Sequence, residues 1–554
     1  MVIATASLHR SQVVLSRYAS PSTFDAEAII IASFNARNAL IDLLNSMRAV
    51  LFFGSFGLVS ATQTVFSAQS DPSLRVGIIG AGAGGSSAAF FLRELAKRDK
   101  DVDIDIHLYE RSGYIGGRST TVKLPSQFGS VSIELGASVF VDANRNLVKA
   151  ASEFGLLLQD GHGSEADTGM AIWDGATFRY RQKQGSYGWL DNVKLVWQYG
   201  RSPFRAHSII QRTIQRFLGL YQDHQPRRNV SDFVAALSDS VDLTKISSER
   251  FQLDNGVGQG FIDDLAGAAS RVNYGQNPLE MHALGGMVSM AASGTHSVVG
   301  GNWQIFEGFV NRSGARVHLS TTVERLTRLD DGKWLLMASG DSGETSSSVF
   351  DVILLAAPAA QTTIEIVNSH AMSRIPQQDY VPLHVKLLVT NASTPLPSFF
   401  GLTDPQETPK TTLSTFAYAN RDQVKRPKFS SLSYLRQLLD DQWVIKIFSE
   451  APFALDEAFA ARDVLWSYDK RWLAYPYLRP NPDLAPIELD RGLYYLNAFE
   501  PLISTMGQSA AFACYRADCE RAETATVASW NAVALVAQDF LDLCPRCTWA
   551  ESPC

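Results

Sequence analysis

RVGIIGAGAGG, from Arg75 to Gly85, decides the fold of this chain, because it joins a short apolar run to a turn rich in glycine. Gly80, Gly82 and Gly85 have the spacing G-x-G-x-x-G. The first glycine permits a tight turn, the second lets the backbone approach a pyrophosphate, and the third lets a helix pack closely on its strand. Residues 86–100 carry apolar side chains near helical spacing, so we expect a helix whose N-terminus faces the phosphates.

The following segment extends this pattern into a dinucleotide-binding unit. Apolar and polar residues alternate between Val102 and Leu108, which predicts a second strand. Glu110 comes directly after that strand, where its carboxylate would accept hydrogen bonds from ribose hydroxyls. A phosphorylated ribose would be repelled by this carboxylate.

A second glycine pair lies in RSGYIGGRST, residues 111–120. A nicotinamide enzyme does not need this pair, whereas a flavin cradle does, since Gly116 and Gly117 allow close approach and Arg118 can pair with the pyrophosphate. The alternative is a Rossmann-type domain in which these residues form only a turn. The order of the motifs, continued by ELGASVF at 134–140, resembles the FAD-binding half of the flavin amine oxidase superfamily.

That resemblance implies FAD as the cofactor and an α/β fold, in which a Rossmann-type FAD-binding domain is interrupted by an α+β substrate-binding domain. The residues implied in FAD binding are Gly80, Gly82, Gly85, Glu110, Arg111, Gly116, Gly117, Arg118, Val323 and Glu500. We expect the FAD-binding domain at 71–160, 298–360 and 491–543, and the substrate-binding domain at 161–297 and 361–490. Residues 1–70 are expected to form an N-terminal extension and 544–554 a cysteine-containing tail.

Four further blocks narrow the resemblance. They are RVNYGQ at 271–276, GGN at 300–302, WLAYPYLRP at 472–480 and GLYYLNAFE at 492–500. These blocks resemble the prenylcysteine oxidase family, also called prenylcysteine lyases, over residues 74 to about 540. The resemblance implies a thioether oxidase that removes a hydride from the carbon next to sulfur in farnesyl- or geranylgeranyl-cysteine. Its products would be cysteine, an isoprenoid aldehyde and hydrogen peroxide, with dioxygen as acceptor.

Two other classes of function stay open. One is an FAD-dependent oxidase of another isoprenoid or an amine in a biosynthetic pathway. The other is a non-enzymatic binder of prenylated proteins, similar to the Rab dissociation inhibitors of the same superfamily. Glu110 and the intact Gly116-Gly117-Arg118 sequence disfavour the binder, because a protein without flavin needs neither.

Catalytic residues are not evident from motifs. His282 and His296 flank an apolar, glycine-rich segment, and Lys386 lies on an expected strand, in a place comparable to the lysine that holds a water near the flavin in amine oxidases. For each of them a packed or solvated side chain is the favoured interpretation. The aromatic stretches 173–197 and 466–477 could line an isoprenoid channel. No metal site is expected.

Composition limits the partners and the compartment. The chain has 554 residues, 45% hydrophobic and 19% charged, which is typical of a globular protein of two or more domains. A net charge of −7 without a long basic run gives no basis for binding nucleic acid. The five cysteines lie at 514, 519, 544, 547 and 554, and we favour disulfides over zinc, with the pairing open.

The segment from Met47 to Ala61 resembles a signal peptide, because a cation precedes an apolar run that ends in small residues. Either the preceding residues are a misassigned extension or the segment is an internal anchor. Sequons at Asn229, Asn311 and Asn391 agree with a location in the secretory pathway, the vacuole or the lysosome, or with a secreted protein. Peripheral association with a membrane and the oligomeric state are left open, as is the role of an apparent insertion at 507–522.

Overall fold

The chain divides into two units, residues 1–70 and 71–554. The computed structural model describes, within the second unit, residues 74–98, 102–160, 170–182, 189–222, 225–238, 241–291, 294–418, 425–504 and 525–543, together with Trp549. The signal-like segment, the cysteines and the insertion at 507–522 lie outside these residues.

A six-stranded sheet is built around the strand that carries the first glycine motif. Its order is β10-β2-β1-β14-β22-β21, with parallel pairing from β10 to β22 and an antiparallel edge strand β21. The apolar residues of its central strands are buried, as in parallel sheets that are covered on both faces. The bounds are β10 (Arg316–His318), β2 (Ile104–Tyr109), β1 (Leu74–Ile79), β14 (Val352–Leu355), β22 (Leu493–Tyr495) and β21 (Glu488–Asp490).

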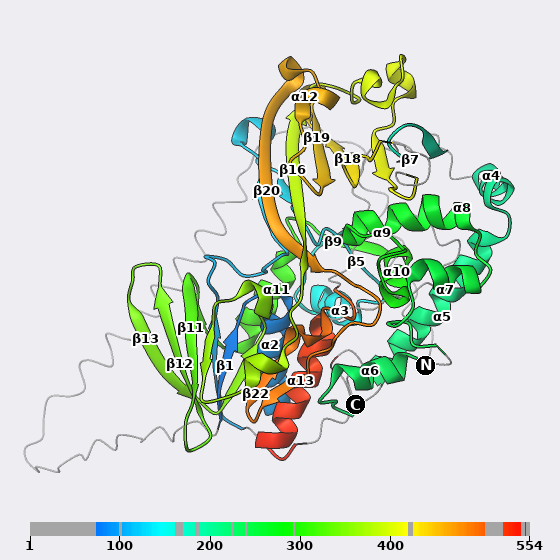
Figure 1. The fold of residues 1–554 in the computed structure, drawn as a ribbon. Coiled ribbons are helices and arrows are strands. Elements are labelled where there is room, and N and C mark those ends of the chain that lie inside the picture. The colour runs from blue at the N-terminus through cyan, green and yellow to red at the C-terminus, as the bar shows by residue number, and fades with distance from the viewer. Residues whose placement is uncertain are drawn as a thin grey trace, which may run out of the picture. The chain divides into compact units, whose positions relative to one another are not determined.

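Helices cover one face of this sheet and a smaller sheet covers the other (Figure 1). The helices are α2 (Ala83–Arg98), α11 (Trp303–Ser313) and α13 (Ala525–Phe540). The smaller sheet has the order β13-β12-β11-β15, with β11 (Thr321–Arg328), β12 (Trp334–Gly340), β13 (Thr345–Phe350) and β15 (Glu365–Val367). Helix α2 begins at the glycine turn, three residues earlier than the apolar pattern predicts, so the glycines form its first turn.

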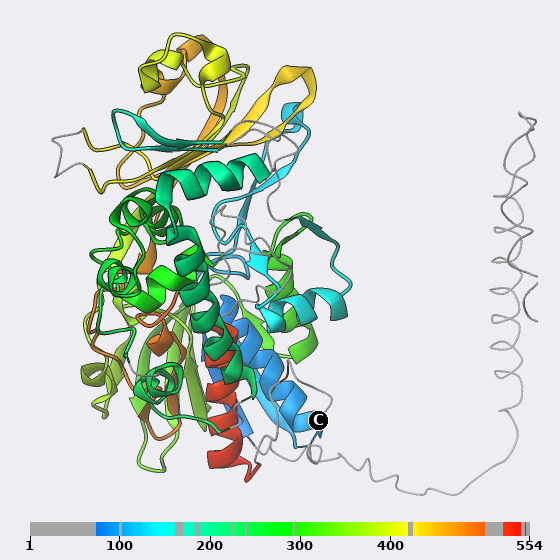
Figure 2. The same ribbon diagram turned by 90° about the vertical axis from the view of Figure 1, so that its right-hand side faces the viewer.

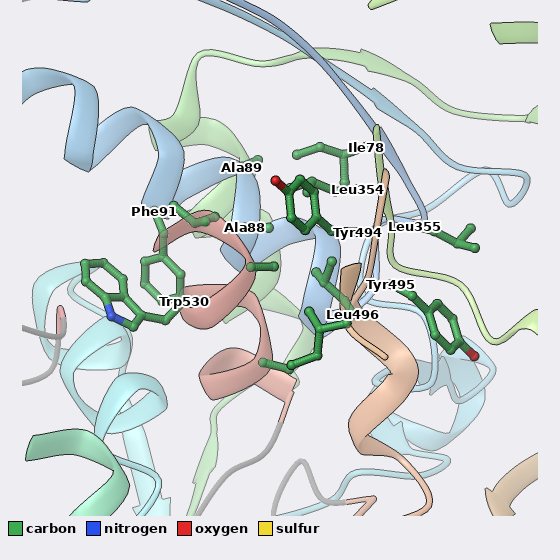
Figure 3. Packing of buried hydrophobic residues seen from close by; sticks show 14 of the residues in the cluster. Ile78, Ala88, Ala89, Phe91, Leu354, Leu355, Tyr494, Tyr495, Leu496 and Trp530 are labelled. Carbon is green, nitrogen blue, oxygen red and sulfur yellow. The ribbon is translucent and has the colours of Figure 1, made fainter. Parts of the chain in front are cut away.

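The core between the six-stranded sheet and its helices joins segments far apart in the sequence. Phe91 of α2 meets Trp530 of α13 edge to face, with ring centroids 5.5 Å apart (Figure 3). Ile78, Leu354 and Tyr494, from three neighbouring strands, are buried in the same cluster. Figure 2 shows α13 in red alongside α2 in blue. The C-terminal helix is therefore an integral part of the flavin-type domain.

A mixed seven-stranded sheet forms the second half, with the order β20-β16-β19-β18-β17-β7-β8. Only the β17–β7 pairing is parallel among its described strands. The bounds are β20 (Val464–Pro476), β16 (Tyr380–Thr390), β19 (Trp443–Ser449), β18 (Ser431–Gln437), β17 (Thr411–Ser414), β7 (Met170–Trp173) and β8 (Phe178–Arg181). The long strand β20 reaches from this sheet toward the flavin-type half (Figure 1).

Helices accompany this sheet. They are α4 (Trp189–Tyr199), α5 (Ser202–Gln222), α6 (Val230–Leu237), α7 (Ser248–Asp254), α8 (Gln259–Phe261), a π-helical turn (Ile262–Ala266), α9 (Gly267–Tyr274), α10 (Ala283–Met290) and α12 (Leu455–Ala458). Strands β7 and β8 come from the same part of the chain as the first of these helices, and β7 pairs with β17, a strand from much later in the chain.

Short elements connect the two halves. They are β3 (Thr121–Lys123), β4 (Ser132–Glu134), β5 (Phe140–Val141), α3 (Arg145–Glu153), β6 (Leu158–Asp160) and β9 (Thr295–Val298). The architecture confirms the predicted α/β class with a Rossmann-type domain, while the domain boundaries stay a prediction. Among the described helices, none is both long and apolar enough to span a membrane. The described residues also hold no group of three or more side chains suited to a metal ion.

Candidate functional site

A cavity of about 570 Å³ opens at the carboxyl ends of the parallel strands. Its wall includes Gly80 after β1, Glu110 after β2 and Ala356 after β14. The carboxyl ends of such strands are where ligands bind in open α/β sheets. Strand β20 closes the opposite side of the cavity with residues 470–475. The two halves of the protein therefore share this cavity.

All of the sequence-predicted FAD residues except Gly85 line the cavity. The lining set comprises Gly80, Gly82, Glu110, Arg111, Gly116, Gly117, Arg118, Val323 and Glu500. Gly85 serves packing instead, because a Cβ atom there would lie 1.9 Å from the carbonyl oxygen of Gly80. This matches the helix-on-strand packing expected for the third glycine of the motif.

The floor of the cavity is backbone, held open by glycines. A Cβ atom on Gly80, whose φ is +104°, would lie 2.7 Å from the carbonyl oxygen of Ala356. At Gly82 a Cβ atom would meet only the Cα of Gly117, at 3.9 Å. The space that the missing side chain of Gly82 leaves therefore belongs to the cavity.

Glu110 fixes the geometry of the glycine turn. Its Oε2 accepts the N–H of Ala81 at 2.8 Å, and its Oε1 accepts the N–H of Ser112 at 2.8 Å. The residue is 9% exposed, so its carboxylate is buried at the cavity wall. Each carboxylate oxygen retains a lone pair, which suits the predicted acceptance of ribose hydroxyls.

Arg118 makes an ion pair that sequence reasoning does not foresee. Its guanidinium pairs with the Glu500 carboxylate, and its Nη1 donates to the carbonyl oxygen of Ala474 at 2.6 Å. The second oxygen of Glu500 accepts the hydroxyl of Tyr380 at 2.5 Å. Burial is the largest cause that raises the pKa of Tyr380, and the negative charge of Glu500 is the next. This hydroxyl therefore stays protonated and donates its hydrogen. The network links the flavin-type half to β16 and β20.

A buried lysine supports the wall of the cavity from behind. Lys446, on the buried strand β19, donates from Nζ to the main-chain oxygen of Glu134 at 3.1 Å and to Oγ of Ser138 at 2.7 Å. Gly136 and Ala137, between these two contacts, line the cavity. The candidate lysine chosen from the sequence is Lys386 and not Lys446. The feature that points to Lys446 is that it is a charged residue within the otherwise apolar strand WVIKIFS.

The carboxyl group of Glu134 shares this environment. Its Oε1 accepts the N–H of Asn302 at 2.6 Å, while Oε2 is buried and has no hydrogen-bond partner among the described residues. Burial raises the pKa of Glu134 to about 7, and burial lowers the pKa of Lys446 to about 8. The pair therefore contains two groups that change charge near neutral pH.

The three weak catalytic candidates lie elsewhere. His282 caps α10, where Nδ1 accepts the N–H of Gly285 at 3.1 Å and Nε2 lies 3.1 Å from the carbonyl oxygen of Pro501. His296 contacts Asp142 at 2.6 Å, and Lys386 donates to Asp469 at 2.9 Å. None of the three is among the residues that line the cavity. Burial lowers the pKa of His282 to about 4, so the ring is neutral.

The two aromatic stretches have different positions. Trp472 and Tyr475, from the later stretch, line the cavity together with Phe499 and Ile503. Trp173, from the earlier stretch, is buried against Phe178 and Phe400 in the seven-stranded half. Only the later stretch therefore contributes to this cavity.

The residues present fit FAD. The glycine-lined floor suits a pyrophosphate, and Glu110 suits the ribose hydroxyls. Val323 lines the wall where the superfamily resemblance implies a backbone contact to adenine. The aromatic and apolar residues of 472–475 and 496–503 offer a surface for the isoalloxazine ring.

Comparison with protein families decides the assignment. The prenylcysteine lyase model matches residues 182–517, which is more than half of the chain. The chain belongs to the prenylcysteine lyase family. A model of an NAD(P)-binding Rossmann-like domain matches residues 78–154, where the glycine motifs and the strand that ends before Glu110 lie.

Curated relatives of this family member cover most of its length. It is 28% identical to farnesylcysteine lyase of Arabidopsis thaliana over 459 residues, 80% of this chain and 87% of the relative. It is 27% identical to human prenylcysteine oxidase 1 over 463 residues, 79% of this chain and 87% of the relative.

Solved structures show the same fold at low sequence identity. Putrescine oxidase bound to putrescine superposes with a TM-score of 0.52 at 13% identity, covering 84% of this chain and 99% of the oxidase. Cyclohexylamine oxidase from Brevibacterium oxydans gives a TM-score of 0.51 at 14% identity, covering 85% of this chain and 100% of the oxidase. These likenesses confirm the amine-oxidase-like architecture.

Proposed function

We propose that this protein is an FAD-dependent oxidase that cleaves S-farnesyl- or S-geranylgeranyl-cysteine at the thioether. The observation that carries the proposal is the shared cavity: the flavin cradle around Gly82 and Glu110 meets an aromatic wall from β20. The family membership supports the substrate class, since relatives are named for farnesylcysteine and prenylcysteine. Dioxygen as the electron acceptor belongs to the same proposal.

The reaction balances with one dioxygen and one water consumed. Bound FAD would accept a hydride from the carbon next to sulfur and pass both electrons to dioxygen, giving hydrogen peroxide. The oxidised carbon is stabilised by sulfur and by the neighbouring alkene, and it gains the oxygen of a water molecule. The carbon–sulfur bond then breaks, and the products are free cysteine and an isoprenoid aldehyde.

The chain supplies position and dryness, which this chemistry requires more than a strong acid or base. Gly80, Gly82 and Gly117 would hold the pyrophosphate through backbone, and Glu110 the ribose. Trp472 and Tyr475 present apolar surface that excludes water from an isoprenoid chain. Arg118, which pairs with Glu500, donates to the main-chain oxygen of Ala474 and so fixes β20 against the flavin-type half.

The direct test is product stoichiometry. Purified protein loaded with FAD is incubated in air with S-farnesylcysteine, and cysteine, farnesal and hydrogen peroxide are quantified. The proposal predicts equal amounts of all three. Turnover of an isoprenoid without sulfur, with none of S-farnesylcysteine or S-geranylgeranylcysteine, would assign the protein to the biosynthetic-oxidase alternative. A protein that binds prenylcysteine and no flavin would be a binder.

We also propose that the protein resides in the secretory pathway, the vacuole or the lysosome. Exposed asparagines at all three sequons, Asn229, Asn311 and Asn391, support this location, because a glycan needs an accessible acceptor. A mobility shift on treatment with an N-glycosidase, applied to protein from its native host, is the expected result. An unshifted protein recovered from the cytosol would contradict the proposed location.

A further inference from the structure

Helix α4 and the start of α5 expose several large apolar side chains. Trp197 is 87% exposed, Phe204 65% and Val193 54%. Val193 and Trp197 are four residues apart in α4, so they lie on one face of the helix. Single exposed apolar residues are ordinary, but three between Val193 and Phe204, one of them a nearly bare tryptophan, indicate an interaction surface.

The opposite side of α4 explains why these residues face outward. Tyr199 is buried, and its hydroxyl donates to Oδ2 of Asp264 at 2.9 Å. Leu195 packs against the same buried cluster. Lys194 donates to the main-chain oxygen of Arg181 at 2.8 Å, which ties α4 to β8. These contacts fix the rotation of α4 and leave Val193 and Trp197 on the outer face.

The same segment is strongly basic. Between Asp191 and Asp223 the sequence has no aspartate or glutamate, although the whole chain has a net charge of −7. The cations in this interval are Lys194, Arg201, Arg205, Arg212 and Arg216. Arg201, Arg205 and Arg212 are exposed. Arg205 bonds to the main-chain oxygen of Gly256 and Arg212 to the side-chain oxygen of Asn255, which are neutral acceptors that leave the positive charge in place.

We propose that Val193, Trp197 and Phe204, together with Arg201, Arg205 and Arg212 of the same segment, form a docking surface for an anionic lipid bilayer. An indole ring favours the boundary between headgroups and acyl chains, because it has an apolar body and a polar N–H. Cations beside it are attracted to anionic headgroups. The pattern matches that of helices that lie in the membrane interface.

A bilayer suits this surface better than an acidic protein for a reason that rests on the proposed function. A farnesyl or geranylgeranyl chain partitions into lipid because each of its apolar carbons favours the acyl region over water, so the proposed substrate would be concentrated there. The protein would then take its substrate from the lipid phase.

Vesicle sedimentation of the full-length protein tests the surface without any turnover. Vesicles of phosphatidylcholine alone are compared with vesicles that also contain phosphatidylserine. We expect binding that requires phosphatidylserine and falls at least about tenfold when Trp197→Ser and Phe204→Ser are combined. The matched control is Leu439→Ser, since Leu439 is 86% exposed but lies beyond β18, and this variant should bind like the wild type.

A charge variant tests the second half of the surface. Arg201→Glu should reduce binding to the vesicles that contain phosphatidylserine. Arg462→Glu is its control, because Arg462 has a side chain 89% exposed and lies between α12 and β20. Salt should weaken wild-type binding, since exposed charges are screened.

Several outcomes would overturn the proposal. Equal vesicle binding of the wild type and the Trp197/Phe204 double variant would place membrane contact elsewhere, including in residues 1–70, which both proteins contain. A dimer in vesicle-free buffer that the double variant abolishes would assign the surface to a second copy of the chain. Turnover of S-farnesylcysteine in detergent, measured in parallel, should be the same for both proteins. If the wild type binds vesicles but does not turn over S-farnesylcysteine, the proposed function is contradicted and the docking surface is supported.

Discussion

Gly82 and Gly85 of the first glycine motif have different roles, and substitution of each by alanine should have different effects. Gly85→Ala puts a Cβ atom 1.9 Å from the carbonyl oxygen of Gly80, so we expect a loss of roughly 3 kcal/mol in the free energy of unfolding. Gly82→Ala has only one neighbour, at 3.9 Å, so the protein should keep its stability. Its new methyl group enters the cavity floor and should prevent FAD retention.

Denaturant unfolding and visible absorbance distinguish the two variants. The expected pair of results is a stable, colourless Gly82→Ala protein and a destabilised Gly85→Ala protein. A yellow Gly82→Ala protein with undiminished FAD content would show that the pyrophosphate does not lie on this turn.

Glu110 offers a second test at the same scale. Glu110→Gln replaces one acceptor oxygen by an amide that faces the N–H of Ala81 or of Ser112. We expect weaker FAD binding, by about tenfold or more, because a ribose acceptor is lost and a buried donor is left unpaired. Glu365→Gln is the matched control, since Glu365 pairs with Arg325 and is not among the residues that line the cavity. Equal FAD affinity in both variants would contradict the role of Glu110.

The contact between β4 and β19 should give stability a distinctive pH dependence. Burial raises the pKa of the Glu134 carboxyl to about 7, above its usual value of 4.5. The folded protein therefore holds this proton more tightly than the unfolded chain. The contribution of this proton to the free energy of unfolding is fully present below pH 4.5, and it is lost as the pH rises through 7.

Glu134→Gln removes this titration and keeps an acceptor for the N–H of Asn302. Between pH 5 and 7 the wild type loses this contribution and the variant does not. We therefore expect the free energy of unfolding of the variant to rise by roughly 2 kcal/mol relative to that of the wild type over this range. Glu365→Gln, at an exposed site paired with Arg325, should show no such change. A constant difference across this range for Glu134→Gln would mean that the carboxyl is not buried as described.

Elements that depend on neighbouring residues could be predicted, and those that depend on distant ones could not. The glycine turn, the first two strands and Glu110 lie in one stretch from Arg75 to Arg118, where spacing alone specifies the geometry. The contacts of Lys446 could not be predicted, because its partners Ser138 and Glu134 are 308 and 312 positions away in the sequence. Tyr380 and Glu500 meet across 120 positions for the same reason. Nonlocal strand pairing creates these contacts, and no sequence pattern near either residue encodes it.

At the scale of the whole molecule, the two halves meet at one cavity and are tied together there. The flavin-type half contributes the glycine cradle, Glu110 and Glu500, and the seven-stranded half contributes β20. Bonds from Arg118 to Ala474 and from Tyr380 to Glu500 cross between the halves. A cofactor held by one half would therefore face a substrate wall supplied by the other.

Rapid anaerobic mixing of the FAD-loaded protein with S-farnesylcysteine tests the central claim most directly. The account predicts that the visible flavin absorbance bleaches in a single turnover, without dioxygen. Deuterium on the carbon next to sulfur should slow the bleaching where hydride transfer limits it. Flavin that stays oxidised with both S-farnesylcysteine and S-geranylgeranylcysteine would contradict the account.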